Sequence, residues 1–144
     1  MSNLITQLQQ YYTDFLAVDP DCLGELYSQQ IIFCDPLHRV EGLAALKDYF
    51  ASMSARMITC RFQFDDAVVA TDDACLPWQM HYAHPRLNAG QTLSLRGCSL
   101  LRFDHRVYYH EDFYDLGAMV YERLPLLGSL VRGVKSRIAG EGPQ

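Results

Sequence analysis

The sequence predicts one α+β domain in which three N-terminal helices pack on a bent antiparallel sheet, with an extra helical tail at the C-terminus. Two patterns carry this prediction. In the first third of the chain, apolar residues recur every three or four positions, which is the period of an amphipathic helix. After Ser54 the period changes to two and stays there for about sixty residues, as in strands. Helices followed by strands indicate an α+β architecture.

Three helices and one short strand are expected before Ser54. The segment 2–18 predicts the first helix, whose apolar face consists of Leu4, Leu8, Tyr11, Tyr12, Phe15 and Leu16. "DPD" at 19–21 ends this helix and caps a short second one through Leu23, Leu26 and Tyr27. The run Ile31–Asp35 is too short and too β-branched for a helix and predicts a strand. Gly42 then opens a third helix, with an apolar side of Leu43, Leu46, Phe50 and Met53.

Long antiparallel strands follow. They are expected at 58–65, 74–84, 92–103 and 107–115, separated by turn sequences at 70–73, 85–90 and 104–106. The strand at 92–103 divides cleanly into two faces. Its interior face is predicted to consist of Leu93, Leu95, Gly97, Ser99, Leu101 and Phe103.

The last predicted strand ends near residue 116, so residues 117–144 are expected to form a separate extension after a domain at 1–116. The extension predicts an amphipathic helix interrupted near Pro125, with an apolar face of Leu126, Leu127, Leu130, Val131, Val134 and Ile138. Arg132, Lys135 and Arg137 oppose that face. Packing on its own domain or on a second subunit is the expected use, and peripheral association with an anionic membrane is the alternative.

Composition excludes several classes of function. A net charge of −5 with no basic stripe over the first hundred residues argues against nucleic acid as a partner. The five cysteines form no C-x-x-C pair and mostly lie in apolar runs, so we expect reduced core residues of a cytoplasmic protein and no zinc site. No stretch reaches the roughly 18 apolar residues of a membrane span, and the N-terminus lacks the pattern of a secretory signal.

Three features follow one another along the chain: a strand ending in "DP", a helix opened by glycine, and long strands ending in "RFD…RV…DFYD". This order resembles the NTF2-like superfamily over about residues 4–116. This superfamily includes ketosteroid isomerases, SnoaL-type polyketide cyclases and limonene-epoxide hydrolases. The resemblance implies a cone-shaped, cystatin-like sheet that wraps a long helix and encloses a deep pocket. Because the fold hosts enzymes, transport factors and non-catalytic binding modules, the resemblance predicts fold more narrowly than function.

Carried over residue by residue, the resemblance implies catalytic candidates. "FCDP" is similar to the isomerase segment that holds the general base, which gives this role to Asp35. Tyr11 falls at or near the isomerase's oxyanion tyrosine, with a register uncertain by one residue because Tyr12 follows. The isomerase's second donor, a protonated acid, is replaced here by Ser99. "HED" is similar to the SnoaL-type pattern, with His110 and Asp112 two apart on the last strand.

Asp112 also matches a carboxylate of the epoxide hydrolases, but their Arg and Asp two apart have no counterpart in "WQMHY". We expect the site to be completed by substrate-binding residues: Trp78, Met80, Tyr82, Leu95, Ser99 and Tyr114. Burial among these side chains would disfavour a charged carboxylate and suit it to act as a general base.

Each candidate has a structural alternative. Asp35 before Pro36 is also a good turn residue looking at water. His110 is equally consistent with a core histidine bonded to the backbone, because the periodicity of its strand does not choose an inner face. Asp112 is placed to pair with Arg102 or Arg106 instead. His81 and His84 are three apart but lack a carboxylate at matching spacing, so they do not predict a metal site.

The sequence therefore predicts a pocket protein that binds a small, largely apolar molecule, needs no metal or organic cofactor, and forms a homodimer through the open sheet face. The leading function is a lyase or isomerase that removes a proton next to a carbonyl group, with Asp35 or Asp112 as base, His110 as proton partner and Tyr11 as donor. The alternative is a non-catalytic module that binds a small molecule or another protein. Neither the substrate nor the existence of a reaction follows from the sequence.

Overall fold

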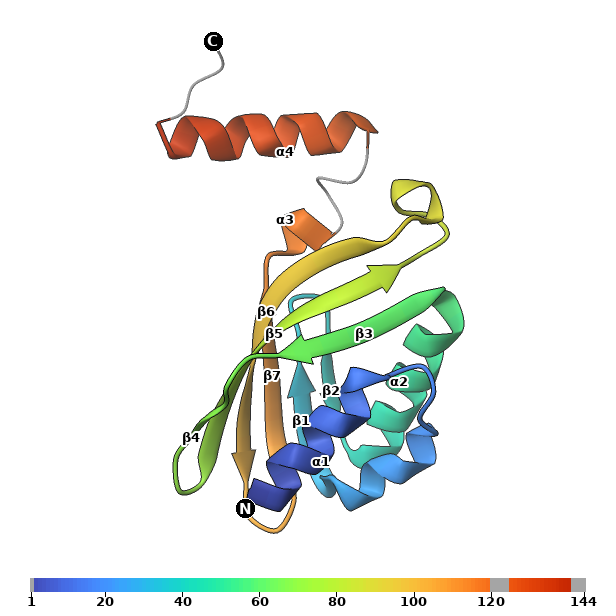
Figure 1. Cartoon of the computed structure of the whole chain (residues 1–144), viewed down its shortest axis with the longest axis vertical. Helices are drawn as coiled ribbons and strands as arrows, with labels where there is room; N and C mark the ends of the chain where they lie inside the picture. The colour runs from blue at the N-terminus through green and yellow to red at the C-terminus, as the bar shows by residue number, and fades with distance from the viewer. Residues whose placement is uncertain (1, 120–124, 141–144) are drawn as a thin grey trace.

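The computed structural model describes residues 2–119 and 125–140. Its helical elements are α1 (Ser2–Thr13), η1 (Pro20–Glu25), α2 (Leu43–Arg56), η2 (Asn88–Gly90), α3 (Leu116–Met119) and α4 (Pro125–Ile138). Its strands are β1 (Tyr27–Cys34), β2 (Arg39–Glu41), β3 (Thr59–Phe64), β4 (Val68–Val69), β5 (Asp73–Ala83), β6 (Leu93–Phe103) and β7 (Val107–Tyr114). The predicted α+β class is confirmed, with helices packed on a curled, unclosed sheet (Figure 1).

The strands form one sheet in the order β2-β1-β7-β6-β5-β3, with β4 paired to β5. The predicted antiparallel order is found for β3, β5, β6 and β7. It is wrong for β1, which lies parallel to the last strand, β7, with Cys34 opposite Glu111. Such a pairing joins segments far apart in sequence, and the alternation within each strand carries no information about it.

The second predicted helix is a single 3₁₀ segment, η1. Asp19 caps its start, since its side chain accepts a hydrogen bond from the backbone N–H of Asp21 at 2.9 Å. Tyr27, assigned to this helix from the sequence, instead begins β1 and is fully buried. The strand therefore starts four residues before the predicted position, and Tyr27 reaches the interior from β1.

The core lies between the curled sheet and the helices α1 and α2. Large buried side chains from both layers meet there, including Phe15, Phe33, Phe50 and Trp78. The predicted interior face of β6 is confirmed, because Leu93, Leu95, Ser99, Leu101 and Phe103 are all buried. Gly97 on the same face lies directly beneath the ring of Trp78.

The cysteines are less buried than the sequence predicted. Only Cys60 among them is buried, whereas Cys22 is exposed and Cys34, Cys75 and Cys98 are half-buried. Cys75 and Cys98 alternate with buried residues of β5 and β6, which places them on the outer face of the sheet. Their Sγ atoms lie 2.6 Å apart.

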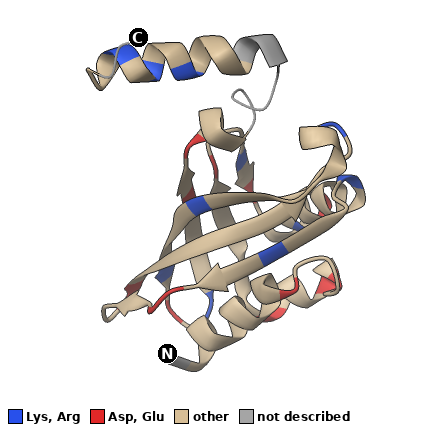
Figure 2. Ribbon diagram, turned by 45° about the horizontal axis from the view of Figure 1, so that its top comes forward, with Lys and Arg blue, Asp and Glu red and all other residues tan. Residues whose placement is uncertain are grey.

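Helix α4 follows the domain and lies beyond its end (Figure 1). Its residues Leu130, Val134 and Ile138 are 68%, 56% and 83% exposed, and its basic residues are visible in Figure 2. An ion pair between Lys135 and Asp115 links it to the residue that follows β7. The predicted face of residues 126 and 127 lies outside the described side chains. Among the helices of the described ranges, none is long and apolar enough to cross a membrane.

Candidate active site

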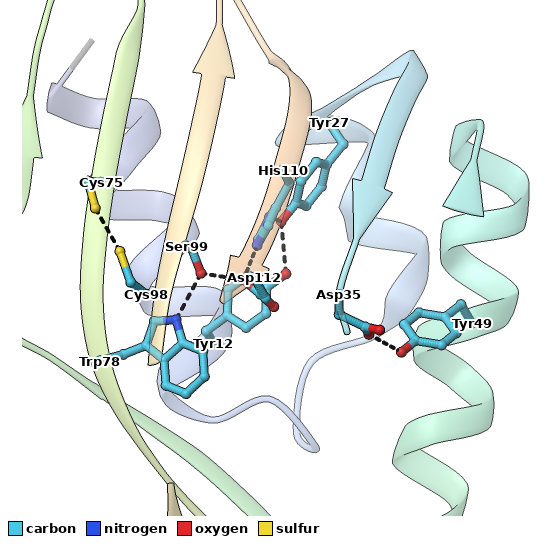
Figure 3. A network of polar contacts seen from close by, with 10 residues as sticks. All are labelled: Tyr12, Tyr27, Asp35, Tyr49, Cys75, Trp78, Cys98, Ser99, His110 and Asp112. Carbon is cyan, nitrogen blue, oxygen red and sulfur yellow. Dashed lines mark hydrogen bonds and ion pairs between the residues drawn. The ribbon is translucent and has the colours of Figure 1, made fainter. Parts of the chain in front are cut away.

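Asp35 lies directly after β1, where the chain turns toward β2. Its Oδ1 atom accepts hydrogen bonds from the backbone N–H groups of Leu37 at 2.8 Å and His38 at 2.7 Å, as in an Asx turn. Its Oδ2 atom accepts a hydrogen bond from the hydroxyl of Tyr49 on α2 (Figure 3). The side chain is 6% exposed. Asp35 therefore forms the turn, as the alternative interpretation expected, but its side chain faces the interior and not water.

His110 and Asp112 lie two apart on β7 and point to the same face. The pairing with β6 decides which face this is: Asp112 is opposite Ser99, and His110 is opposite Leu101, both of which point inward. Nε2 of His110 lies 2.7 Å from Oδ1 of Asp112. The side chain of His110 is 1% exposed and that of Asp112 is 12% exposed. The two residues form a buried acid–base pair whose carboxylate retains some access.

A chain of hydrogen bonds extends from this pair in both directions (Figure 3). Trp78 donates its Nε1–H to Oγ of Ser99 at 2.9 Å, which leaves the Ser99 hydroxyl to donate to Oδ1 of Asp112 at 2.5 Å. On the other side, Nδ1 of His110 lies 2.8 Å from the Tyr27 hydroxyl. The Tyr27 hydroxyl lies 2.8 Å from that of Tyr12. The chain thus connects β5, β6, β7, β1 and α1.

The chemistry of the groups fixes the direction of these bonds. An ionised carboxylate can only accept, so a neutral His110 donates through Nε2–H to Asp112 and accepts at Nδ1. Tyr27 then donates to His110, and its oxygen accepts the hydrogen of Tyr12. If His110 gains a second proton, both tyrosine hydrogen bonds reverse direction: His110 donates to Tyr27, and Tyr27 donates to Tyr12. The protonation state of the buried pair is therefore coupled to the direction in which the Tyr12 hydroxyl points.

Burial raises the pKa of Tyr12 and of Tyr27 well above the usual range for a tyrosine. Burial also raises the pKa of Tyr49, and its hydrogen bond to Asp35 adds to this effect. These hydroxyl groups therefore stay protonated at neutral pH and serve as donors and acceptors within the network.

An enclosed inner cavity of about 50 Å³ lies between the helices and the sheet. Its wall contains Asp35 and Asp112, and apolar side chains that include Tyr12, Trp78, Met80 and Tyr114. A water molecule needs roughly 10–15 Å³ by this type of measure, so the inner cavity has room for about four non-hydrogen atoms.

A second hollow of about 520 Å³, here called the mouth, is lined by Asp35, Pro36, Glu111, Asp112, Phe113 and Tyr114. Asp35, Asp112 and Tyr114 belong to both spaces, which makes the mouth the approach to the inner cavity. The mouth forms because β1 ends at Cys34, opposite Glu111, while β7 continues to Tyr114.

A larger hollow, about 940 Å³, lies elsewhere, between α1 and β3, and is lined by residues such as Gln9 and Arg61. It contains none of the acid–base candidates. We therefore place the candidate site in the inner cavity, where the titratable groups converge.

The structure brings most of the sequence-predicted site residues together. Asp35, Asp112, Trp78, Met80 and Tyr114 line the inner cavity, and His110 and Ser99 contact Asp112 from behind. Two predicted pocket residues, Tyr82 and Leu95, are buried in the core and are not part of the cavity wall. Tyr11 is directed away, beside Cys22 and Glu25, whereas its neighbour Tyr12 lines the cavity.

Three site residues were not anticipated in these roles. Tyr12 and Tyr27 extend the hydrogen-bond chain, and Tyr49 binds Asp35. Two of them had a signal in the sequence. Tyr12 lies on the apolar face of the first helix, next to Tyr11, and Tyr49 lies one turn from buried Leu46 on α2. Within the described residues, no group of three or more His, Cys, Asp or Glu side chains is arranged to hold a metal ion.

Solved structures with the same fold include a hypothetical protein with a ketosteroid isomerase-like fold from Catenulispora acidiphila, in complex with trimethylamine. It is 16% identical, with a TM-score of 0.72 over 83% of this chain and 90% of that chain. A SnoaL-like polyketide cyclase, so named, from Jannaschia is 17% identical, with a TM-score of 0.73 over 86% and 94% of the two chains. An NTF2-like protein of unknown function from Burkholderia pseudomallei is 16% identical, with a TM-score of 0.72 over 87% and 100%.

These similarities define the class of the molecule as an NTF2-like cone with a ketosteroid isomerase-like fold. Residues 8–110 match the model of the SnoaL-like domain, and the chain belongs to that family. No curated protein matches the sequence significantly. Family and fold support a ligand-binding or isomerase- or cyclase-like domain.

Proposed function

We propose that the protein is a cofactor-independent acid–base enzyme of the lyase or isomerase type, acting on a small molecule with an acidic C–H bond next to a carbonyl group. The observation that carries the proposal is the contact between His110 and Asp112, 2.7 Å long, at the wall of a cavity. A carboxylate held by an imidazole in a confined space is a suitable general base.

Asp112 is better placed than Asp35 to act as this base. Three donors occupy the two oxygens of Asp35. In contrast, both donors of Asp112 use Oδ1, and within the described residues no hydrogen bond reaches Oδ2. Oδ2 is therefore free to take the proton, while Ser99 and His110 hold the carboxylate in position. Asp35 contributes a fixed negative charge to the wall.

The carboxylate that takes the proton also returns it. The C–H bond breaks as its proton moves to Oδ2 of Asp112, and the electron pair remains on the substrate. The proton on Asp112 returns to a different atom of the substrate in an isomerase, or to the leaving group in a lyase. Tyr12, at the other end of the chain from Asp112, takes the cavity position that the sequence assigned to Tyr11.

A non-catalytic binding function is the second candidate, because the inner cavity has room for only a compact molecule. The complex of the Catenulispora acidiphila protein with trimethylamine supports a pocket for small ligands in this fold.

Deuterium exchange tests the proposal directly. A panel of small ketones is incubated with the protein in heavy water, and NMR spectroscopy follows the replacement of C–H by C–D. We expect exchange with wild type and a loss of about 10²- to 10⁴-fold in Asp112→Asn. Asp65→Asn, which removes an exposed carboxylate paired with Arg96, is the matched control and should keep full activity.

Two outcomes contradict catalysis. Ketones that bind the inner cavity without exchange would establish the non-catalytic function instead. Exchange that persists in Asp112→Asn would remove Asp112 from the proposal and transfer the role of base to Asp35.

A further inference from the structure

We infer that the ligand of this site is a small organic cation, whose positive charge is held between Asp35 and Asp112 at the mouth. The inference rests on the proposed function in one respect, since it takes the inner cavity and the mouth as the place where the ligand binds. It adds the charge and chemical class of that ligand.

The first observation is the charge of the lining. Three of the six residues around the mouth are carboxylates, and two of these also border the inner cavity. Among the described residues that line either space, none is Lys or Arg. The Glu111 carboxylate is directed to the outer face of β7, where it accepts a hydrogen bond from Tyr109, so Asp35 and Asp112 carry the charge of the site. His38 lies 3.8 Å from Asp35 and His110 lies 2.7 Å from Asp112, and each offsets a carboxylate only when protonated. An acidic hollow with apolar walls concentrates cations and repels anions.

The second observation is the direction of the hydrogen bonds. Oδ2 of Asp112 is an acceptor. When His110 is neutral, the Tyr12 hydroxyl donates its hydrogen to Tyr27, so the Tyr12 oxygen presents only an acceptor to the cavity. The Tyr49 hydrogen is bound to Asp35. A ligand that carries a negative charge before any reaction would find few donors here. The Tyr114 hydroxyl is the lining group that remains able to donate to a carbonyl oxygen.

The third observation is the aromatic wall. Tyr12, Trp78 and Tyr114 border the inner cavity together with several phenylalanines. Aromatic faces attract alkylammonium groups, which have an apolar surface and a spread positive charge. After burial, the negative charges of Asp35 and Asp112 raise the pKa of Tyr114, which is the electrostatic effect that a bound cation would relieve. Charge and shape thus favour the same class of ligand.

A pair of nearly isosteric probes separates charge from shape. Choline carries a quaternary ammonium group, and 3,3-dimethylbutan-1-ol has a neutral carbon atom at the same position. Two-dimensional NMR titrations of the full chain would follow both the affinity and the residues affected. We expect choline to bind at least about tenfold more tightly than the alcohol, with shifts centred on Asp35, Asp112 and Tyr114.

Variants locate the effect. Asp35→Asn, which keeps an oxygen for the backbone N–H groups of Leu37 and His38, should weaken choline binding severalfold and leave the alcohol unchanged. Glu111→Gln, which changes a carboxylate on the outer face of β7, should leave both affinities unchanged. Tyr114→Phe should leave choline binding nearly unchanged, because it removes a hydroxyl but keeps the ring. Asp65→Asn is again the control for a lost negative charge outside the site.

Equal affinity for the two probes, or no binding of choline, would overturn the inference. Its failure is distinguishable from failure of the proposed function. If choline does not bind but ketones still exchange in wild type and not in Asp112→Asn, the acid–base function stands with a neutral substrate. If choline binds and no ketone exchanges, the cationic ligand stands and the proposed reaction falls.

Discussion

At the scale of single residues, the site depends on the partner to which each hydroxyl donates its hydrogen. Tyr11 and Tyr12 are adjacent, are both buried, and differ in surroundings rather than in burial. Tyr12 bonds to Tyr27 inside the core, whereas Tyr11 borders an outer hollow beside Cys22. The two neighbours therefore provide a matched test of the network.

Tyr12→Phe should lower the free energy of unfolding by about 1–3 kcal/mol, because the buried Tyr27 hydroxyl loses a partner. Tyr11→Phe should change it by less than about 0.5 kcal/mol. Urea unfolding of both variants measures the difference. Equal losses would show that the hydrogen bond between Tyr12 and Tyr27 contributes nothing specific.

The buried tyrosines also predict how stability depends on pH. Burial raises the pKa of Tyr11 to about 12 and raises those of Tyr12 and Tyr27 well above the usual range. A raised folded-state pKa means that the unfolded chain loses its proton first. Stability from these groups is therefore complete below the unfolded pKa of about 10 and is lost as pH rises from there toward the folded values.

Urea unfolding between pH 8 and pH 11 measures this loss. Each such tyrosine should contribute up to about 1.4 kcal/mol per pH unit above pH 10. Tyr27→Phe should show a shallower decline than wild type. The same slope in both proteins would contradict the assignment to Tyr27.

At the scale of elements, β5 and β6 pair Trp78 with Gly97, and the Trp78 ring covers that glycine. A Cβ atom added at residue 97 would lie 2.2 Å from the nearest carbon of the Trp78 ring. The ring is held by its hydrogen bond to Ser99, which in turn positions Asp112. A methyl group at this point would therefore disturb both packing and site.

Gly97→Ala should destabilise the protein by about 1–3 kcal/mol through overpacking. Gly133→Ala on α4 is the matched control, since nothing lies within 4 Å of the added atom. The control should be neutral or stabilising by up to about 1 kcal/mol, because alanine favours a helix. Thermal or urea unfolding measures both, and a neutral Gly97→Ala would mean that Trp78 moves freely.

The outer face of the same two strands carries Cys75 and Cys98 with their sulfur atoms 2.6 Å apart. Treatment with hydrogen peroxide should join them in a disulfide, as two thiols lose two hydrogens and the peroxide is reduced to water. Because burial raises the pKa of Cys98 to about 12, and thiolates react faster than thiols, the rate should increase with pH. Mass spectrometry after alkylation detects the pair, and Cys75→Ser should abolish it. Oxidation mainly at exposed Cys22 would contradict the prediction.

Elements with a regular period could be predicted from the sequence. The inner face of β6 follows from alternation, and so does the α+β class. The inner face of β7 could not be predicted, because Val107, His110 and Asp112 do not share one parity, and only the pairing with β6 decides it. The start of β1 at Tyr27 was missed because Leu23, Leu26 and Tyr27 have helical spacing, so the helix predicted after the cap at 19–21 was drawn too long.

At the scale of the whole molecule, α4 stands apart from the core. Leu130, Val134 and Ile138 are exposed, so they contribute little to the stability of the domain as described. A chain that ends at Met119 should therefore keep the free energy of unfolding of the full chain within about 1 kcal/mol. A loss of several kcal/mol would contradict the boundary near residue 116.

The expected homodimer is tested with the same two chains. Light scattering of the full chain should give the mass of a dimer, and the shortened chain shows whether the apolar face of α4 takes part. Monomers of both chains would contradict the dimer through the open sheet face.

The parallel pairing of β1 with β7 has a consequence for how the protein is made. The hydrogen bond between Tyr27 and His110 joins residues 83 positions apart, so neither the first nor the last strand can complete the site alone. A growing chain on the ribosome has its helices and first strand long before β7 emerges, and closing so long a loop is slow. The acidic mouth takes residues from both strands and therefore cannot form before β7 has emerged, so a partly synthesised chain that lacks β7 cannot bind the ligand there.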